Sequence, residues 1–237
     1  MAKSFFIWKN QDCRAMGVFL QGPVPIVRPE ERVEHVEIPG RSGDLTELEG
    51  ENIFNSYIQT ATIMVKGDFH VREVYRWLKG SGYVTFSGEP DRKQKARIIG
   101  AVTLNKHSAN SDWWVGEVQF YCQPLKELLS ENAAVVTSSG ATVLNSGDVQ
   151  SRPKFTATAN ATSLTITIGD RSLTVTGLTS GYTYIIDSET MEVTDNAGTT
   201  ILTQNSTGDF PMLEAGYNTV TGSGWSRLEI DRRERFL

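Results

Sequence analysis

The stretch Val36-Glu-Ile-Pro-Gly-Arg-Ser-Gly-Asp-Leu-Thr46 decides how the first half of the chain folds. An extended apolar run stops at Pro39, and a turn follows in which Gly40 and Gly43 can take backbone angles that are closed to other residues. Further along, Tyr75-Arg-Trp-Leu-Lys-Gly80 runs into Tyr83-Val-Thr-Phe-Ser-Gly-Glu-Pro-Asp91. Neither stretch contains a reactive group, so together they specify a shape.

The second stretch predicts a short helix that leads directly into a strand. Asp68 is the expected N-cap, and Gly80 lies where a left-handed C-cap belongs. Apolar residues recur at i, i+3, i+4 and i+7, namely Val71, Val74, Tyr75 and Leu78. The pattern therefore predicts one helix of about three turns with an apolar stripe to bury.

Elsewhere the first half predicts strands. Two segments alternate between apolar and polar residues, one carrying Ala96, Ile98, Gly100, Val102 and Leu104 and the other Trp114, Gly116, Val118, Phe120 and Cys122. We expect them to form an antiparallel pair with one dry face. The opposite face carries Trp113, Val115 and Tyr121, which either a second layer of the same domain or a neighbouring subunit must cover. Head-to-tail contacts between subunits close into a ring when the rotation closes.

Charge and composition divide the 237 residues into two domains. Residues 1–130 hold 16 Lys or Arg and 16 Asp or Glu, whereas residues 131–237 hold 7 and 12. We expect the strand that contains Tyr121 to end at Pro124, because proline cannot continue a ladder. Residues 131–151 are then either a linker or the site of a first strand of the second domain, at residues 141–144.

The second half predicts a β-sandwich, because short strands alternate with polar turns over about a hundred residues. The expected strands are residues 155–159, 163–168, 172–175, 183–186, 192–194, 200–202, 217–220 and 226–230. The whole chain is thus expected to be mainly β, with a single short helix in its first half.

The chain lacks the residue patterns of enzymes and metal proteins. It has no phosphate loop, dinucleotide fingerprint or nucleophile elbow, so no catalytic or cofactor-binding residue is assigned. The three histidines have no partner at metal-ligand spacing, so no metal site is assigned either. Cys13 and Cys122 are expected to be buried free thiols, with a disulfide as the alternative.

Two basic runs and the N-terminus bear on the partners. Residues 92–97 and 232–235 could contact nucleic acid, but the net charge of −5 favours an exposed loop or an intersubunit salt bridge. No stretch approaches the roughly twenty apolar residues of a membrane span, and Phe5-Phe-Ile-Trp8 is too short for a signal peptide. We expect a protein that is made and stays in a cytoplasm, without membrane insertion.

The order of these motifs resembles the N-terminal domain of the distal tail protein (Dit) family of long, non-contractile-tailed bacteriophages. The second half resembles the family's C-terminal domain, through Tyr184-Ile-Ile-Asp187, Asp209-Phe-Pro211, Leu213-Glu-Ala-Gly-Tyr-Asn218 and Glu229-Ile-Asp-Arg-Arg-Glu-Arg235. Ser42 departs from the pattern, because family members more often carry an acidic residue there. The likeness spans nearly the whole chain and lies in the joint order of the motifs.

The resemblance implies a structural, non-enzymatic baseplate hub in the virion tail of a siphovirus or prophage, synthesised in the bacterial host cytoplasm. It implies a hexameric ring of N-terminal domains between the major tail tube protein and the tail tip or tail-associated lysin protein. Galectin-like C-terminal sandwiches then project outward and, in some phages, carry receptor-binding proteins. DNA would pass through the lumen without specific binding. The intersubunit or partner contacts that we predict are Arg41, Asp44, Trp77 and Trp113.

The alternative function is a carbohydrate-binding module in the second domain, because sugars stack on exposed aromatic rings. Its candidate stacking residue is Trp225, for which an edge or core position is the competing interpretation. The second half contains no histidine, which disfavours lectin activity of the galectin type.

Overall fold

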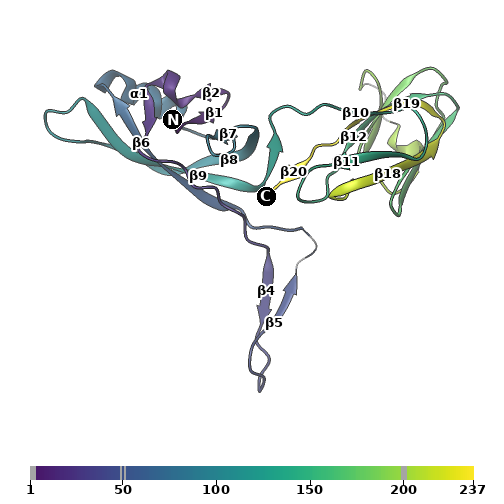
Figure 1. The fold of residues 1–237 in the computed structure, drawn as a ribbon, viewed down its shortest axis with the longest axis horizontal. Helices are drawn as coiled ribbons and strands as arrows, with labels where there is room; N and C mark the ends of the chain where they lie inside the picture. The colour runs from purple at the N-terminus through teal and green to yellow at the C-terminus, as the bar shows by residue number, and fades with distance from the viewer. Residues whose placement is uncertain (1–3, 49, 51, 199–201) are drawn as a thin grey trace. The chain divides into compact units, whose positions relative to one another are not determined.

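The computed structural model describes residues 4–48, 50, 52–198 and 202–237 (Figure 1). The protein is mainly β, as predicted, and contains one α-helix in the described residues. The chain divides into two compact units, residues 1–129 together with Leu237, and residues 130–236.

Seven strands of the first unit form one antiparallel sheet in the order β2-β1-β7-β8-β9-β6-β3. Its elements are β1 (Phe6–Trp8), β2 (Gln11–Asp12), the 3₁₀ turn η1 (Cys13–Met16), β3 (Val18–Leu20), β6 (Tyr57–Lys66), α1 (Asp68–Trp77), β7 (Ser81–Phe86), β8 (Arg92–Lys106) and β9 (Trp113–Leu128). The remaining two, β4 (Val33–Val36) and β5 (Leu45–Leu48), form a separate two-stranded hairpin between β3 and β6.

Helix α1 forms where the apolar spacing predicts it. Val74 and Leu78 are buried against the sheet, and Val71 packs against the same core. The expected N-cap is wrong, because Gly67 caps the helix and Asp68 is its first residue. At the other end Leu78 is the cap, and Gly80 adopts the expected left-handed φ of 72° two residues later.

The predicted antiparallel pair of long strands is β8 and β9, and its register sets Ala96 opposite Cys122 and Ile98 opposite Phe120. The prediction that this strand ends at Pro124 is wrong, because β9 continues to Leu128. The ladder absorbs the proline at a bulge, since the next paired residues after Ala96 and Cys122 are Gln94 and Lys126.

The second unit consists of two five-stranded antiparallel sheets that enclose one hydrophobic core. One sheet has the order β10-β19-β12-β15-β16 and the other β11-β18-β13-β14-β17. The elements are β10 (Ala134–Val136), β11 (Ala141–Asn145), β12 (Lys154–Ala159), β13 (Ser163–Ile168), β14 (Arg171–Thr176), β15 (Thr183–Asp187), β16 (Glu192–Asp195), η2 (Thr203–Asn205), β17 (Ser206–Gly208), β18 (Gly216–Ser223), β19 (Trp225–Asp231) and β20 (Arg235–Phe236).

Most strands expected in this half are present. The segment 141–144 is a strand, β11, rather than part of a linker, because it pairs along its length with β18. The strand expected at residues 200–202 falls on residues outside the described part of the chain, except for Leu202, which lies in no strand. The sequence analysis missed β10, β17 and β20, which have two or three residues each and are too short to show alternation.

Gly116 on β9 allows the closest approach between β8 and β9. A Cβ atom at this position would overlap the carbonyl oxygen of Thr103. We expect Gly116→Ala to lower the free energy of unfolding by about 2 kcal/mol, because the two strands must separate. Urea denaturation measures this change. Gly22→Ala is the control, because a Cβ there meets no atom within 4 Å. Equal stability of both variants would contradict the assigned register.

Candidate functional site

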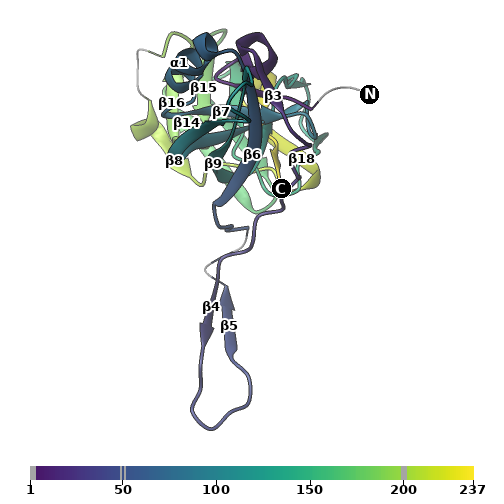
Figure 2. The same ribbon diagram turned by 90° about the vertical axis from the view of Figure 1, so that its left-hand side faces the viewer.

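The most exposed structural feature of the first unit is the hairpin of β4 and β5, which we call the arm, residues 33–48 (Figures 1 and 2). Its strands pair in register from Val33 with Leu48 to Val36 with Leu45. Arg41 and Asp44 lie in the connecting turn and are exposed. Gly40 and Gly43 hold that turn with φ angles of 81° and 83°.

The arm exposes apolar side chains that its own unit does not cover. The exposed fractions are 37% for Val36, 38% for Ile38 and 39% for Leu45. A two-stranded hairpin is at best marginally stable in water, and apolar burial is what stabilises larger sheets. The exposed parts of these side chains are therefore accessible to another surface. Arg41 and Asp44 belong to it, and their role as contacts stays a prediction.

Trp77 fastens helix α1 to the sheet. Its ring stacks on Phe6, with centroids 5.5 Å apart and planes at 9°. The indole N–H of Trp77 donates to the carbonyl oxygen of Trp8 at 3.2 Å, and the indole of Trp8 donates to the carbonyl of Trp77 at 3.2 Å. Trp77 is half-buried, so much of its surface serves this anchor.

Trp113 lies at the start of β9, half-buried. Its ring meets Phe19 edge-on at 5.7 Å, and the ammonium of Lys66 lies 5.9 Å from its centroid. On the same face Tyr121 is 41% exposed. The contact role of Trp113 stays a prediction, and its position leaves part of the ring accessible.

Trp225, the candidate for sugar stacking, is only 6% exposed and belongs to the core of the second unit. Its indole N–H donates to the carbonyl oxygen of Thr165 at 3.2 Å. Core burial leaves almost no ring face for a sugar. The exposed aromatic side chains of this unit are Tyr182, at 65%, and Tyr217, at 80%.

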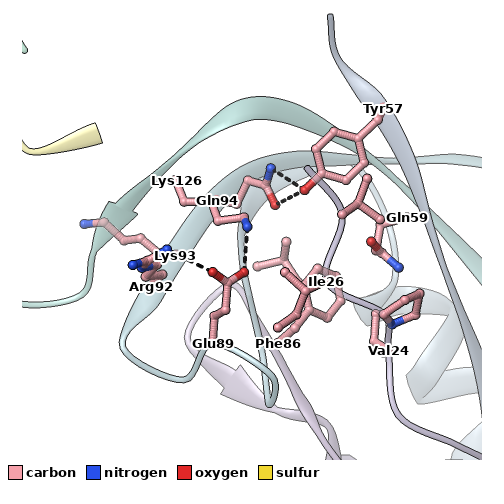
Figure 3. Close-up of a pocket in the computed structure, with 13 residues that line it drawn as sticks. Val24, Ile26, Tyr57, Gln59, Phe86, Glu89, Arg92, Lys93, Gln94 and Lys126 are labelled. Atoms are coloured by element: carbon pink, nitrogen blue, oxygen red, sulfur yellow. Dashed lines mark hydrogen bonds and ion pairs between the residues drawn. The ribbon is translucent and has the colours of Figure 1, made fainter. Parts of the chain in front are cut away.

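A cleft in the first unit gathers ionisable side chains (Figure 3). Glu89 accepts from the ammonium of Lys126 at 2.6 Å and from the guanidinium of Arg92 at 3.0 Å. Beside them the amide of Gln94 donates to the hydroxyl of Tyr57 at 2.9 Å, and burial raises the pKa of Tyr57 to about 12. The cleft has a volume of about 20 Å³, which is room for a single water molecule. It is therefore an internal ionic network rather than a substrate site.

A second hollow of about 430 Å³ lies over β8 and β9 and opens widely to solvent. Its lining has one ionisable side chain, Glu117, among small or neutral residues. A lone carboxylate provides no acid–base pair of the kind that hydrolytic chemistry uses.

The remaining groups of chemical interest are the two thiols and the side chains that could bind a metal. Cys13 and Cys122 are buried and free, as predicted, and burial raises the pKa of Cys122 to about 12. Such a thiol is not ionised at neutral pH and is a poor nucleophile. Within the described ranges, no three His, Cys, Asp or Glu side chains are grouped to hold a metal. None of the described helices is long and apolar enough to cross a membrane.

The basic run at residues 232–235 is paired inside its own unit, and the run at residues 92–97 is paired in part. Residues 92–97 lie in strand β8 rather than in a loop, and Lys93 lies 3.8 Å from Glu127. The run at residues 232–235 forms ion pairs within the second unit: Arg232 with Glu131 and Glu234, Arg233 with Asp187 and Glu189, and Arg235 with Glu189. In the first run only Arg92 and Lys93 have carboxylate partners, whereas Lys95 and Arg97 are exposed, with none among the described residues. The arginines at residues 232–235 are all engaged by carboxylates, so that segment presents no free row of charges to phosphates.

No protein-family model and no curated protein sequence matches this chain. Among solved structures, the crystal structure of the Dit (gp 19.1) protein of SPP1 superimposes with a TM-score of 0.78 at 18% identity, covering 99% of each chain. That protein is described as a paradigm of the hub adsorption apparatus in phages that infect Gram-positive bacteria. The two chains share one fold throughout, which confirms at the level of structure the resemblance indicated by the motifs.

Trp77 provides a test of the helix anchor. We expect Trp77→Ala to lower the free energy of unfolding by about 2–3 kcal/mol, because the variant loses the stacked ring and the hydrogen bond that the Trp77 indole donates to Trp8. Chemical denaturation measures the loss. Arg76→Ala, one residue away and exposed, should stay within about 0.5 kcal/mol of the parent. If Trp77→Ala left the free energy of unfolding unchanged, the ring would not contribute to the packing.

Asp187 provides a test of the ion pairs in the second unit. Burial raises its pKa, but hydrogen bonds from Arg233, at 2.7 and 2.8 Å, and from the backbone of Glu189 outweigh burial and lower it. Because the folded pKa lies below the unfolded value of about 3.9, this stabilisation is complete above about pH 4 and disappears on acidification.

We therefore expect Asp187→Asn to lower the melting temperature at pH 7, and the difference from the parent to shrink below pH 3. Scanning calorimetry across pH measures both effects. Asp170→Asn, in an exposed turn, is the matched control and should follow the parent. A difference that stays constant with pH would exclude the carboxylate as its source.

Proposed function

We propose that this protein is a structural component of a phage tail, the distal hub that joins the tail tube to the tip or adsorption apparatus. The carrying observation is the common fold with a phage hub protein over 99% of each chain. The sequence motifs of both halves support the same role. The proposed mechanism is symmetric docking and load bearing, with no chemical step.

The first unit is proposed to form the ring. The arm gives it a projecting surface whose apolar side chains need a partner, and Tyr121 and Trp113 leave one face of the sheet partly open. When a surface of one copy binds a different surface of the next copy, the contacts are head-to-tail, and they form a closed ring when the rotation closes. We infer six copies, as the resemblance implies. The major tail tube protein would dock on one side of the ring and the tip or tail-associated lysin protein on the other.

The second unit is proposed as a mount for side proteins such as receptor-binding proteins. Its two sheets enclose a complete core, so its outer surfaces are available for docking without rearrangement. A carbohydrate-binding role has less support, because Trp225 lies inside that core. DNA would cross the ring without specific contacts, and two cations of the basic run in β8, Arg92 and Lys93, are already engaged by carboxylates.

Arm variants test the proposed ring. Val36→Ser with Leu45→Ser, and Arg41→Ala with Asp44→Ala, change only exposed side chains. We expect each pair to weaken self-association at least about tenfold, or ~1.4 kcal/mol, because the contact loses apolar area or polar anchors. Sedimentation velocity measures the association, and circular dichroism checks the fold.

Tyr217→Ser is the matched control, because it removes an exposed apolar surface from the second unit. It should associate like the parent. If both arm pairs assembled normally, the arm would not be the ring-forming element.

A further inference from the structure

Charge is segregated within the first unit. Residues 30–51, which include the arm, hold eight Asp or Glu and two Arg, a net charge of −6. The rest of the unit, residues 1–29 and 52–129, holds fourteen Lys or Arg and eight Asp or Glu, a net charge of +6. The two charges cancel, so the first unit is neutral overall, with its negative charge in the arm segment and its positive charge in the rest of the unit.

Part of the positive charge of the body is unpaired, and some of it lies on helix α1. Arg14, Arg92 and Lys126 each pair with a carboxylate of the same unit. In contrast, among the described residues no carboxylate pairs with Arg72 or Arg76, and both side chains are exposed. The one acidic side chain described on the helix, Glu73, lies 3.5 Å from His70.

These cations gather on one side of the helix. Arg72 and Arg76 are four residues apart in α1 and so share a face, and Lys79 follows two residues after the helix ends at Trp77. Lys9 adds a fourth cation, because its Nζ donates to the carbonyl oxygen of Lys79 at 2.8 Å. We call Lys9, Arg72, Arg76 and Lys79 the helix cation stripe. Like charges at this spacing repel, and an anionic partner would remove that repulsion.

The arm carries both carboxylates and apolar side chains that could contact the helix cation stripe and its surroundings. It presents the carboxylates of Glu34, Glu37 and Asp44 together with half-exposed apolar side chains such as Val36 and Ile38. Beside the stripe, Tyr75 is 40% exposed, and its hydroxyl accepts from the backbone N–H of Leu104 at 3.3 Å. Carboxylates would meet guanidinium and ammonium groups while apolar side chains cover the tyrosine ring.

Both views place the arm and α1 at opposite ends of the first unit (Figures 1 and 2). The arm of a chain therefore does not reach its own helix. A contact between the two surfaces joins different copies, and it is head-to-tail, because the arm and the helix are different surfaces.

We propose that the acidic arm of one copy docks on the helix cation stripe of a second copy. This contact rests on the proposed ring and names the surface that receives the arm. Because both surfaces are exposed before docking, their attraction is screened by salt. Assembly should therefore weaken as the ionic strength rises.

Charge reversal tests the contact with two variants of the full chain. One reverses the arm, Glu34→Lys with Glu37→Lys, and the other reverses the helix, Arg72→Glu with Arg76→Glu. Each variant alone should associate at least about tenfold more weakly than the parent, because its two surfaces then carry the same sign. An equimolar mixture should regain the parent mass, because each arm finds a helix of opposite charge on the other variant.

The matched control for the helix variant is Lys95→Glu with Arg97→Glu, which makes the same change of −4 in net charge at exposed positions of β8. It should assemble like the parent, as measured by light scattering. If the mixture stayed dissociated while the parent assembled, or if the control dissociated as well, the arm–helix contact would be wrong and the proposed ring would stand. A parent that stayed monomeric at every concentration would overturn the ring and the contact together.

Discussion

The constraint that governs the first unit is that the arm, residues 33–48, leaves Val36, Ile38 and Leu45 each more than a third exposed to solvent. Two strands have no core, and apolar burial is the main source of stability in a sheet. A two-stranded hairpin becomes more stable when another surface packs against it, because binding then buries apolar side chains that folding alone leaves exposed. In the proposed ring, a neighbouring copy would cover the exposed parts of Val36, Ile38 and Leu45.

The body of the first unit, from which the arm extends, is held together by contacts between helix α1 and the sheet. The reciprocal indole hydrogen bonds of Trp8 and Trp77 fasten the helix to the sheet, and Phe6 fills the space between them. On the other side of the unit, Glu89 and Lys126 form a nearly buried ion pair. Breaking one partner of such a pair is costly, so both features favour a single conformation of the unit.

Much of this fold could be predicted from the sequence. The helix, the pairing of β8 with β9 and most strands of the second unit follow from periodicity, because each is long enough to repeat its pattern. The N-cap failed because Gly67, with a φ of 82°, makes the turn and leaves Asp68 inside the helix. Pro124 misled for a related reason, since a bulge can hold a proline that a regular ladder cannot.

The functional surfaces were harder to predict, because they depend on what lies opposite each residue in space. Arg41 and Asp44 were predictable as exposed turn residues. In contrast, no local pattern shows that the indole N–H of Trp77 donates a hydrogen bond to the carbonyl oxygen of Trp8. Similarly, the pairing of the run at residues 232–235 with Asp187 and Glu189 joins segments that are far apart in the sequence. The acidic excess of residues 30–51 can be counted from the sequence, whereas only the structure shows that no carboxylate among the described residues pairs with Arg72 or Arg76.

The most direct test of the central claim is the absolute mass of the unmodified chain in solution, measured by light scattering on a sizing column over a range of concentrations. The account predicts a species near six times the 26.2 kDa of one chain at low ionic strength. A mass of one chain at every concentration and salt condition would contradict it.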